Sequence, residues 1–423
     1  MSRVANKWAA VILLFLSGVT FGQGDEIYEP RYFDFVQYDK NEVVLPKADA
    51  LDHFFEGLDR LAENQEDKVS IVHIGDSHIQ ADYFSNHIRE QILSIPYFGN
   101  GGRGFVFPYT VAKTNNPINY YSTCKGRWTG ARNSVNKHAS RWGLAGVTAS
   151  TYDSTASFMI RLNADEKSPL TFSTNKVSVY YPTEDSTEYG VALRLTNDSL
   201  VYGVSDTLGR VTFELDSLSE EIWFELTKNG PHQNHFTLQG IFLENDDPGV
   251  VYSSLGANGA KVNSFLKCQD FIPHLASVHP DLVIISLGTN DAYNTAFNGI
   301  IFKREVEQLV FWVKQAAPES SILLTTPGDC FRRRRYINYD NAKAKNVLIQ
   351  VAKEQGLAIW DFYEIMGGLQ SMEKWRDFGL GKRDLIHLTD KGYILQGELL
   401  FNALIIDKYF GEYQTFVKKD SSE

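Results

Sequence analysis

A serine, and a histidine preceded by an aspartate, supply the residue types of a nucleophilic catalytic centre. Ser77 lies in Gly75-Asp76-Ser77-His78, directly after an apolar run, and His387 lies in Asp384-Leu385-Ile386-His387. A neutral histidine can take the proton of a serine hydroxyl. A carboxylate on its other ring nitrogen fixes the tautomer and stabilises the imidazolium. Taken alone, Ser77 also fits a helix N-cap, and His387 fits a surface loop that precedes a helix.

Two further segments carry groups that can hold the negative oxygen formed during acyl transfer. Leu255-Gly256-Ala257-Asn258-Gly259-Ala260 has paired glycines, which let backbone N–H groups face a ligand. In Gly288-Thr289-Asn290-Asp291, the side-chain amide of Asn290 can donate to the same oxygen. Each segment also has a simpler interpretation, as a tight turn or as an Asx turn that caps the next helix.

Apolar runs alternating with helical spacing predict a parallel sheet that positions these segments. Strands are expected at 69–74, 282–287, 322–324 and 357–359, and helices at 47–64, from Gly75 to about Ser94, at 343–353 and near the C-terminus. This alternation is typical of βαβ units. Because ligands bind at the carboxyl ends of parallel strands, we expect all four segments at one edge of the sheet.

The middle of the chain has a different character. It is rich in Ser, Thr, Asn, Asp and Tyr, and short apolar runs recur between turn residues, at 156–162, 176–181, 191–195, 211–215, 222–226 and 236–243. This spacing is typical of a β-sandwich. We therefore predict an all-β domain at 109–250, inserted into an α/β domain.

The order Gly-Asp-Ser, Gly, Gly-Thr-Asn-Asp, Asp-x-x-His resembles that of the SGNH (GDSL-like) hydrolases. The resemblance implies a three-layer α/β/α fold, with Ser77 as nucleophile, His387 as base and Asp384 as its partner. It also implies an oxyanion hole formed by the N–H groups of Ser77 and Gly259 and by the side chain of Asn290. Gly259 is the second glycine of the family's Gly-x-x-Gly turn, and Gly256 is the alternative. The resemblance covers about 69–108 and 251–410, but not the middle.

A closer likeness is to the peptidoglycan O-acetylesterases, which carry a carbohydrate-binding-like β-sandwich inserted in the SGNH domain. It rests on His78 directly after Ser77, on the later segment Gly101–Pro108 and on the β-rich insert. The resemblance implies an esterase that removes acetyl groups from the 6-position of N-acetylmuramic acid, through an acetyl-enzyme on Ser77. We expect His78, Arg103 and Trp375 to contact the substrate. Trp375 lies in a glycine-containing loop, 367–381, just before Asp384.

Three other activities remain open from the sequence. The same catalytic residues serve a glycan O-acetyltransferase, in which the acyl group passes to a sugar hydroxyl. They also serve an acetyl esterase that acts on a xylan-type polysaccharide. A non-catalytic glycan-binding protein that uses the β insert is the alternative from a different class.

Composition limits the partners. The chain has 423 residues, 41 of them basic and 52 acidic, for a net charge of -11, which argues against a nucleic-acid binder. The spacing of its 3 cysteines matches no zinc pattern, and no phosphate-binding glycine loop occurs, so neither a metal nor another cofactor is expected. No disulfide is predicted. Four consecutive arginines, 332–335, can grip an anionic glycan or simply form a solvated loop.

The N-terminus has the pattern of an export signal. Arg3 and Lys7 precede an apolar stretch from Trp8 to Val19, with small residues at Thr20 and Gly22. We expect cleavage before Gln23 and a periplasmic or secreted protein without an integral membrane domain; an uncleaved anchor is the alternative. The expected organisation is a signal peptide at 1–22, an arm at 23–46, the SGNH domain at 47–108 and 251–423, and the insert at 109–250.

Overall fold

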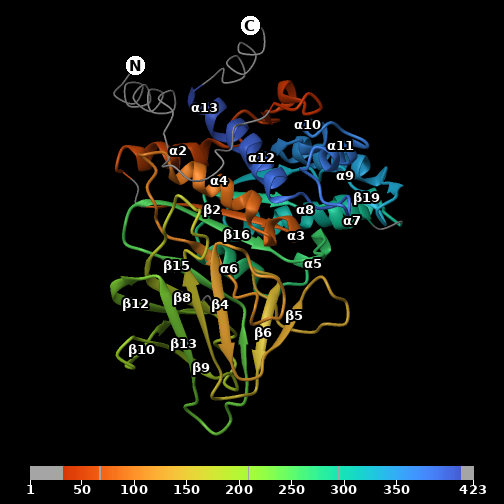
Figure 1. Cartoon of the computed structure of the whole chain (residues 1–423). Helices are drawn as coiled ribbons and strands as arrows, with labels where there is room; N and C mark the ends of the chain where they lie inside the picture. Colours follow the sequence, from red (N-terminus) through yellow and green to blue (C-terminus); the bar gives the residue numbers. More distant parts are fainter. Residues whose placement is uncertain (1–31, 66–67, 208, 294–295, 411–423) are drawn as a thin grey trace.

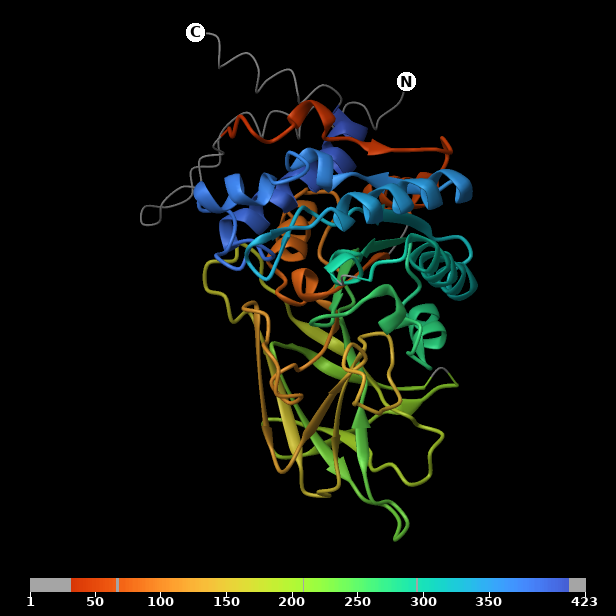
Figure 2. The same cartoon turned by 90° about the vertical axis from the view of Figure 1, so that its right-hand side faces the viewer.

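The computed structural model describes residues 32–65, 68–207, 209–293 and 296–410. The predicted signal peptide and the beginning of the predicted arm lie outside these ranges. Within them, no helix combines the length and the apolar character needed to cross a membrane. Helices surround one sheet at one end of the molecule, and further β-sheets form the other end (Figures 1 and 2).

The first sheet has six strands, five of them parallel. Its order is β1-β21-β18-β17-β2-β16, and only β1, at one edge, runs antiparallel to its neighbour. The strands are β1 Val43–Val44, β2 Lys68–Gly75, β16 Gly249–Gly256, β17 Leu282–Ser286, β18 Ser321–Thr325 and β21 Ala358–Trp360. The central strands are buried almost throughout, as expected for apolar runs covered on both faces. The predicted strands are confirmed, and the predicted arm supplies the edge strand β1.

Helices cover both faces of this sheet. α4 packs against α12, and α8 packs against α9. The helices are η1 Tyr38–Lys40, α2 Asp52–Ala62, α3 Ser77–Gln80, α4 Tyr83–Leu93, α5 Val262–Phe265, α6 Phe271–Ser277, α7 Thr289–Tyr293, α8 Gly299–Ala316, α9 Asp340–Gln355, α10 Phe362–Ile365, α11 Ser371–Asp377, α12 Asp390–Phe401, η2 Asn402–Ile406 and α13 Asp407–Phe410. The predicted three-layer α/β/α class is therefore confirmed.

The single helix predicted after Gly75 is in fact two helices. α3 ends at Gln80 and α4 begins at Tyr83, because Asp82 between them adopts a left-handed backbone with φ +55°. The buried carboxylate of Asp82 forms ion pairs with Arg89 and Arg103, which fixes the break in place.

The middle of the chain forms antiparallel sheets. One has the order β10-β9-β13-β7-β4, a second β11-β12-β8-β15-β3 and a third β14-β6-β5. Their strands are β3 Gly104–Val106, β4 Tyr120–Lys125, β5 Thr129–Arg132, β6 Val147–Thr151, β7 Ser157–Leu162, β8 Thr174–Tyr180, β9 Gly190–Arg194, β10 Leu200–Tyr202, β11 Val204–Ser205, β12 Arg210–Ser219, β13 Glu221–Thr227, β14 Phe236–Leu238 and β15 Gly240–Glu244. The predicted run 236–243 is divided at Gln239 between two sheets. A short hairpin, β19 Phe331–Arg332 and β20 Tyr336–Ile337, completes the strands.

The antiparallel sheets are joined closely to the parallel sheet. β3 precedes the predicted start of the insert, yet it pairs with β15 in the second antiparallel sheet. The backbone N–H of Phe105 in β3 donates to the Ser253 hydroxyl in β16 at 2.9 Å. Tyr109 donates its hydroxyl proton to the Gly256 carbonyl oxygen at 2.7 Å. The predicted domain boundaries stay predictions.

Candidate active site

Ser77, His387 and Asp384 form a continuous hydrogen-bonded chain. Ser77 Oγ lies 2.9 Å from His387 Nε2, and His387 Nδ1 lies 2.8 Å from Asp384 Oδ2. Because an ionised carboxylate only accepts hydrogen bonds, Nδ1 carries the proton and Nε2 is left to accept from the serine hydroxyl. About a third of the His387 side chain is exposed, so a ligand can reach it. This arrangement can remove a proton from Ser77 and return it to a leaving group.

The loop that carries the acid and the base is held in shape by the acid itself. Asp384 Oδ1 accepts the backbone N–H groups of Ile386 and His387, both at 2.9 Å. Between them, Leu385 is buried and adopts φ +56°, a conformation that a branched side chain rarely takes. Burial opposes ionisation of Asp384, but the hydrogen bonds from His387 and Ile386 outweigh it and lower the pKa of the carboxyl group.

Ser77 begins helix α3, directly after strand β2. The preceding residue, Asp76, is the N-cap and accepts the backbone N–H of His78 on Oδ1 at 3.0 Å. The first turn of a helix has backbone N–H groups without intrahelical partners, so they can donate to an oxyanion formed at Ser77. Asp76 is 1% exposed, and this burial raises the pKa of its carboxyl group to about 6.

Asn290 lies in α7, at the carboxyl end of the neighbouring strand β17, and borders the same pocket as Ser77. Its side-chain Nδ2 donates to Asp76 Oδ2 at 2.9 Å and to the Ala260 carbonyl oxygen at 3.0 Å. Both amide hydrogens therefore have protein acceptors. An oxyanion bound at Ser77 would have to share one of them.

The two candidate oxyanion glycines have different surroundings. Gly259 is exposed at the pocket with φ +76°, and a Cβ placed on it would meet only Ser134, at 3.9 Å. Gly256 is packed against α3, where a Cβ would lie 2.0 Å from the Gln80 backbone nitrogen. Gly259 thus presents its backbone to a ligand, whereas Gly256 allows a strand and a helix to approach closely.

The pocket has a volume of about 530 Å³ and includes residues that sequence reasoning did not identify. Alongside Ser77, Gly259, Asn290, Asp384 and His387, it is lined by Asn115, Asn258, Tyr293, Lys382 and Tyr393, among others. Asn258 and Lys382 lie close in sequence to predicted site residues, and this proximity could have identified them as pocket residues. Asn115 comes from the predicted insert, and its sequence context gives no sign of a place in the pocket.

Two predicted substrate contacts are corrected. Arg103 is 2% exposed and forms an ion pair with Asp82 at 2.7 Å, away from the Ser77 pocket. Trp375 is fully buried, and its Nε1 donates to the Met366 carbonyl oxygen at 2.9 Å. Both side chains therefore make their polar contacts inside the protein. A large aromatic ring in a glycine-containing loop is therefore part of the core here.

His78, the third predicted contact, lies behind the catalytic histidine. The centroids of the His78 and His387 rings are 5.2 Å apart, and His78 Nδ1 lies 2.8 Å from the Tyr393 hydroxyl oxygen. His78 Nε2 is buried. Burial, followed by the nearby His387, lowers the pKa of His78 to about 3. With both ring nitrogens turned inward, His78 supports His387 and does not face the substrate pocket.

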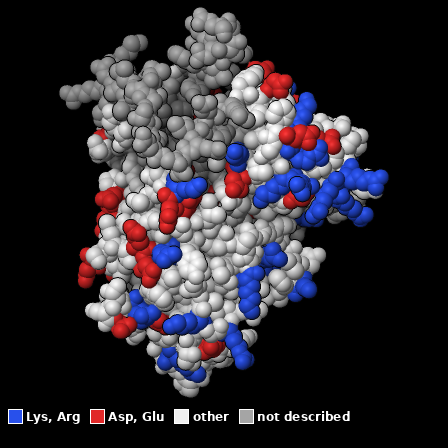
Figure 3. Space-filling view, viewed as in Figure 1, with Lys and Arg blue, Asp and Glu red and all other residues white. Residues whose placement is uncertain are grey.

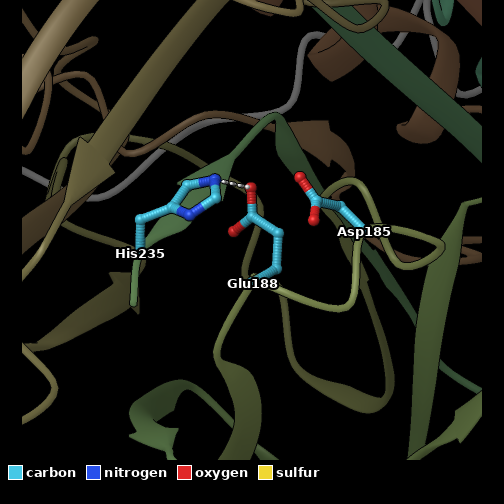
Figure 4. Close-up of side chains that lie close together, drawn as sticks. All are labelled: Asp185, Glu188 and His235. Carbon is cyan, nitrogen blue, oxygen red and sulfur yellow. Dashed lines mark ion pairs between the residues drawn. The ribbon is translucent and has the colours of Figure 1, made fainter. Parts of the chain in front are cut away.

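A second group of polar side chains lies far along the chain from this site. Asp185, Glu188 and His235 have potential metal-ligating atoms within 4.8 Å of one another (Figure 4). Glu188 accepts the backbone N–H of Thr237 at 2.8 Å and pairs with His235 Nε2 at 3.1 Å. Asp185 accepts the Thr187 hydroxyl. These contacts indicate a structural role for the cluster, which links the turn at 182–189 to the start of β14.

Part of the chain is similar to a known protein family. Residues 198–395 match the GDSL-like Lipase/Acylhydrolase family. The matched range includes Asn290 and His387, while Ser77 precedes it. No curated protein gives a significant match.

A solved structure of a peptidoglycan O-acetylesterase shares the fold of this chain, and two other esterase structures match only part of it. The chain resembles a peptidoglycan O-acetylesterase structure at 20% identity, covering 89% of this chain and 99% of that chain with a TM-score of 0.71. An acetylxylan esterase from Geobacillus stearothermophilus is 18% identical, covering 38% and 73% with a TM-score of 0.29. A lipase/acylhydrolase from Enterococcus faecalis is 23% identical, covering 36% and 75% with a TM-score of 0.30. Residues 198–395 therefore match a GDSL-like lipase/acylhydrolase domain, and the chain shares its fold with the peptidoglycan O-acetylesterase structure.

Proposed function

We propose that this protein is a serine O-acetylesterase acting on a cell-wall glycan, with Ser77 as the nucleophile. The observation that carries the proposal is the pair of hydrogen bonds at 2.9 and 2.8 Å that links Ser77 through His387 to Asp384. A serine, a base and an orienting carboxylate in this order are what nucleophilic acyl transfer requires.

The reaction proceeds through an acetyl-enzyme. Ser77 Oγ attacks the carbonyl carbon of the acetyl ester while its proton passes to His387 Nε2. The tetrahedral oxyanion is held by the N–H groups of Ser77 and Gly259 and by the Asn290 amide, which Asp76 keeps in place. The bond to the sugar oxygen then breaks, and His387 protonates that oxygen. Water then attacks the carbonyl carbon of the acetyl-enzyme and gives a proton to His387. His387 passes this proton to Ser77 Oγ as the ester bond breaks and acetate is released.

Peptidoglycan is the proposed glycan. The peptidoglycan O-acetylesterase structure matches this chain across 99% of its own length, so the similarity extends through the antiparallel sheets as well as the catalytic part. The pocket supports the same substrate, because its lining includes the polar side chains of Asn115, Asn258 and Lys382. These side chains can form hydrogen bonds with the hydroxyl groups of a sugar.

The proposal is tested by acetate release from O-acetylated peptidoglycan, with O-acetylated xylan as a parallel substrate. Ser77→Ala removes the nucleophile. Ser94→Ala is the matched control, because Ser94 is exposed and bonds only locally to the Gln91 carbonyl oxygen. We expect release from peptidoglycan that Ser77→Ala abolishes and Ser94→Ala leaves intact.

Other outcomes would change the proposed substrate, reaction or nucleophile. Ser77-dependent release from xylan alone would move the substrate to a neutral polysaccharide. Acetate transfer to an added acceptor glycan, in place of release, would make the enzyme a transferase. Equal release by Ser77→Ala and the parent protein would refute Ser77 as nucleophile.

A further inference from the structure

The four consecutive arginines form a tight hairpin that the mechanism does not use. We define residues 331–337, which comprise β19, β20 and the turn between them, as the basic hairpin. Phe331 pairs with Ile337, and Arg332 with Tyr336. Between the strands, Arg333 and Arg334 adopt φ +52° and +60°. Asn and Gly favour such turns because positive φ crowds other side chains. Two arginines at these positions are an outlier that points to a function.

Hydrogen bonds connect the base of the basic hairpin to two segments of the catalytic site. The backbone N–H of Phe331 donates to the Leu385 carbonyl oxygen at 2.8 Å, within the Asp384–His387 loop. Arg332 donates to the carbonyl oxygens of Ala292 and Tyr293 at 2.7 and 3.1 Å, at the end of the helix that carries Asn290. These bonds place the hairpin at the rim of the pocket.

A further contact joins the turn to a residue that lines the pocket. The backbone N–H of Arg333 donates to the Tyr293 hydroxyl oxygen at 2.9 Å, and Tyr293 lines the pocket with Ser77 and His387. In Figure 1, β19 lies beside α7, at the side of the sheet where β2 runs into α3. The turn is therefore next to the site at which substrate would enter.

The guanidinium groups of the turn are accessible to an anion. Arg333, Arg334 and Arg335 are all exposed, and none is in ion-pair contact with a carboxylate of the described residues. Arg332, in contrast, pairs with Asp340 and serves as the anchor. Figure 3 shows Lys and Arg gathered at the edge where Figure 1 places β19. Lys382, exposed on the other loop of the pocket, adds a further cation.

This local positive charge contrasts with the negative net charge of the chain, which is -11. A local field of one sign beside a cleft attracts ligands of the opposite sign and raises their local concentration. Guanidinium groups bind carboxylates through two parallel hydrogen bonds, which also orients the ligand.

We propose that the basic hairpin and Lys382 form a carboxylate-binding subsite at the mouth of the Ser77 pocket. The substrate is accordingly an acetylated glycan that bears carboxylates near the ester, and a neutral acetylated polysaccharide is a poor substrate. The inference rests on the proposed esterase function and specifies its substrate class. The carboxylate can belong to a sugar acid or to an attached peptide.

The test compares kcat/KM on acidic and neutral acetyl esters. The acidic substrates are O-acetylated peptidoglycan, for peptide carboxylates, and O-acetylated polygalacturonate, for sugar carboxylates; acetylated xylan and p-nitrophenyl acetate are neutral. We expect Arg333→Gln/Arg334→Gln/Arg335→Gln to lower the ratio of acidic to neutral kcat/KM by about tenfold or more at low salt. Added salt should lower this ratio in the parent protein and much less in the variant.

Two further variants separate charge from structure. Arg127→Gln/Lys167→Gln/Lys228→Gln removes the same charge from exposed loops between the antiparallel strands and should leave the ratio unchanged. Arg333→Asn/Arg334→Gly removes two cations while supplying residues that the turn prefers, so it should fold at least as well and still lose selectivity.

The possible failures are distinguishable. Absence of Ser77-dependent hydrolysis of any ester would overturn the proposed function itself. Ser77-dependent hydrolysis with an unchanged acidic-to-neutral ratio in both hairpin variants would overturn only the subsite. So would a parent enzyme that prefers acetylated xylan. A ratio that falls on one acidic substrate alone would identify the source of the carboxylate.

Discussion

Asp76 and Asn290 follow neighbouring parallel strands and are in direct contact: Asn290 Nδ2 donates to Asp76 Oδ2 at 2.9 Å. The carboxylate directly before the nucleophile thus fixes the amide proposed to hold the oxyanion. Its other oxygen accepts the backbone N–H of His78 at 3.0 Å. One buried side chain therefore shapes both the turn at Ser77 and the orientation of Asn290.

Asp76→Asn should reduce turnover with little change in KM. The new amide can still accept the His78 N–H, but its NH₂ group then faces the NH₂ group of Asn290. Misaligned donors stabilise the transition state less, so we expect kcat to fall by roughly 10- to 100-fold, less than the 10²–10³-fold that follows loss of a donor. Steady-state kinetics with p-nitrophenyl acetate would measure this. An unchanged kcat would separate Asp76 from the oxyanion hole.

The same residue should make folding stability depend on pH. Burial raises the pKa of Asp76 to about 6, so the folded protein keeps this proton after the unfolded chain has lost it. Between about pH 4 and pH 6, the contribution of Asp76 to the free energy of unfolding therefore falls as the pH rises. The unfolding free energy of the parent relative to Asp76→Asn should drop by about 2 kcal/mol from pH 4 to pH 7. Urea denaturation at both pH values checks this, and a difference that does not vary with pH would contradict it.

Asp384→Asn should lower kcat by about 10²–10⁴-fold, because the amide cannot stabilise the imidazolium form of His387. The lowered pKa of Asp384 keeps this carboxylate ionised as the pH falls towards its ordinary range. Asp377→Asn is the matched control, since Asp377 is exposed and pairs only with Arg376. If Asp384→Asn retained the activity of that control, His387 would not depend on Asp384.

Alanine substitutions at Gly256 and Gly259 should have different effects. Gly256→Ala places a Cβ 2.0 Å from the Gln80 backbone nitrogen, so it should destabilise the fold and lower Tm. At Gly259 the space is open but φ is +76°, so Gly259→Ala should cost only about 1 kcal/mol of stability while disturbing the N–H that faces the pocket. Thermal unfolding together with kcat separates the two effects. A Gly259→Ala enzyme with full activity would remove this glycine from the oxyanion hole.

The sequence was sufficient for the features that local pattern determines. Strands such as β2 and β17 follow from continuous apolar runs, and Ser77, Asn290 and His387 follow from their positions after strands or before a helix. The structure brings these residues to one pocket, as expected from a parallel sheet.

Other features depend on contacts between distant segments. Arg103 lies in the segment Gly101–Pro108, on which the predicted substrate contact was based, but Asp82, which interrupts the first helix, binds it internally. Trp375 is buried by packing that its local sequence does not reveal. Asn115 reaches the pocket from the predicted insert, because that segment folds back over the turn at Asn258. Burial and long-range pairing decide these cases, and neither has a local signature.

The most direct test of the central claim is to trap the acyl-enzyme. The protein is mixed with p-nitrophenyl acetate, quenched in acid during turnover and digested, and the peptides are analysed by mass spectrometry. The account predicts the added mass of one acetyl group on the peptide that contains Ser77, and no such label in Ser77→Ala. An acetyl group on another residue, or continued acetate release by Ser77→Ala, would contradict it.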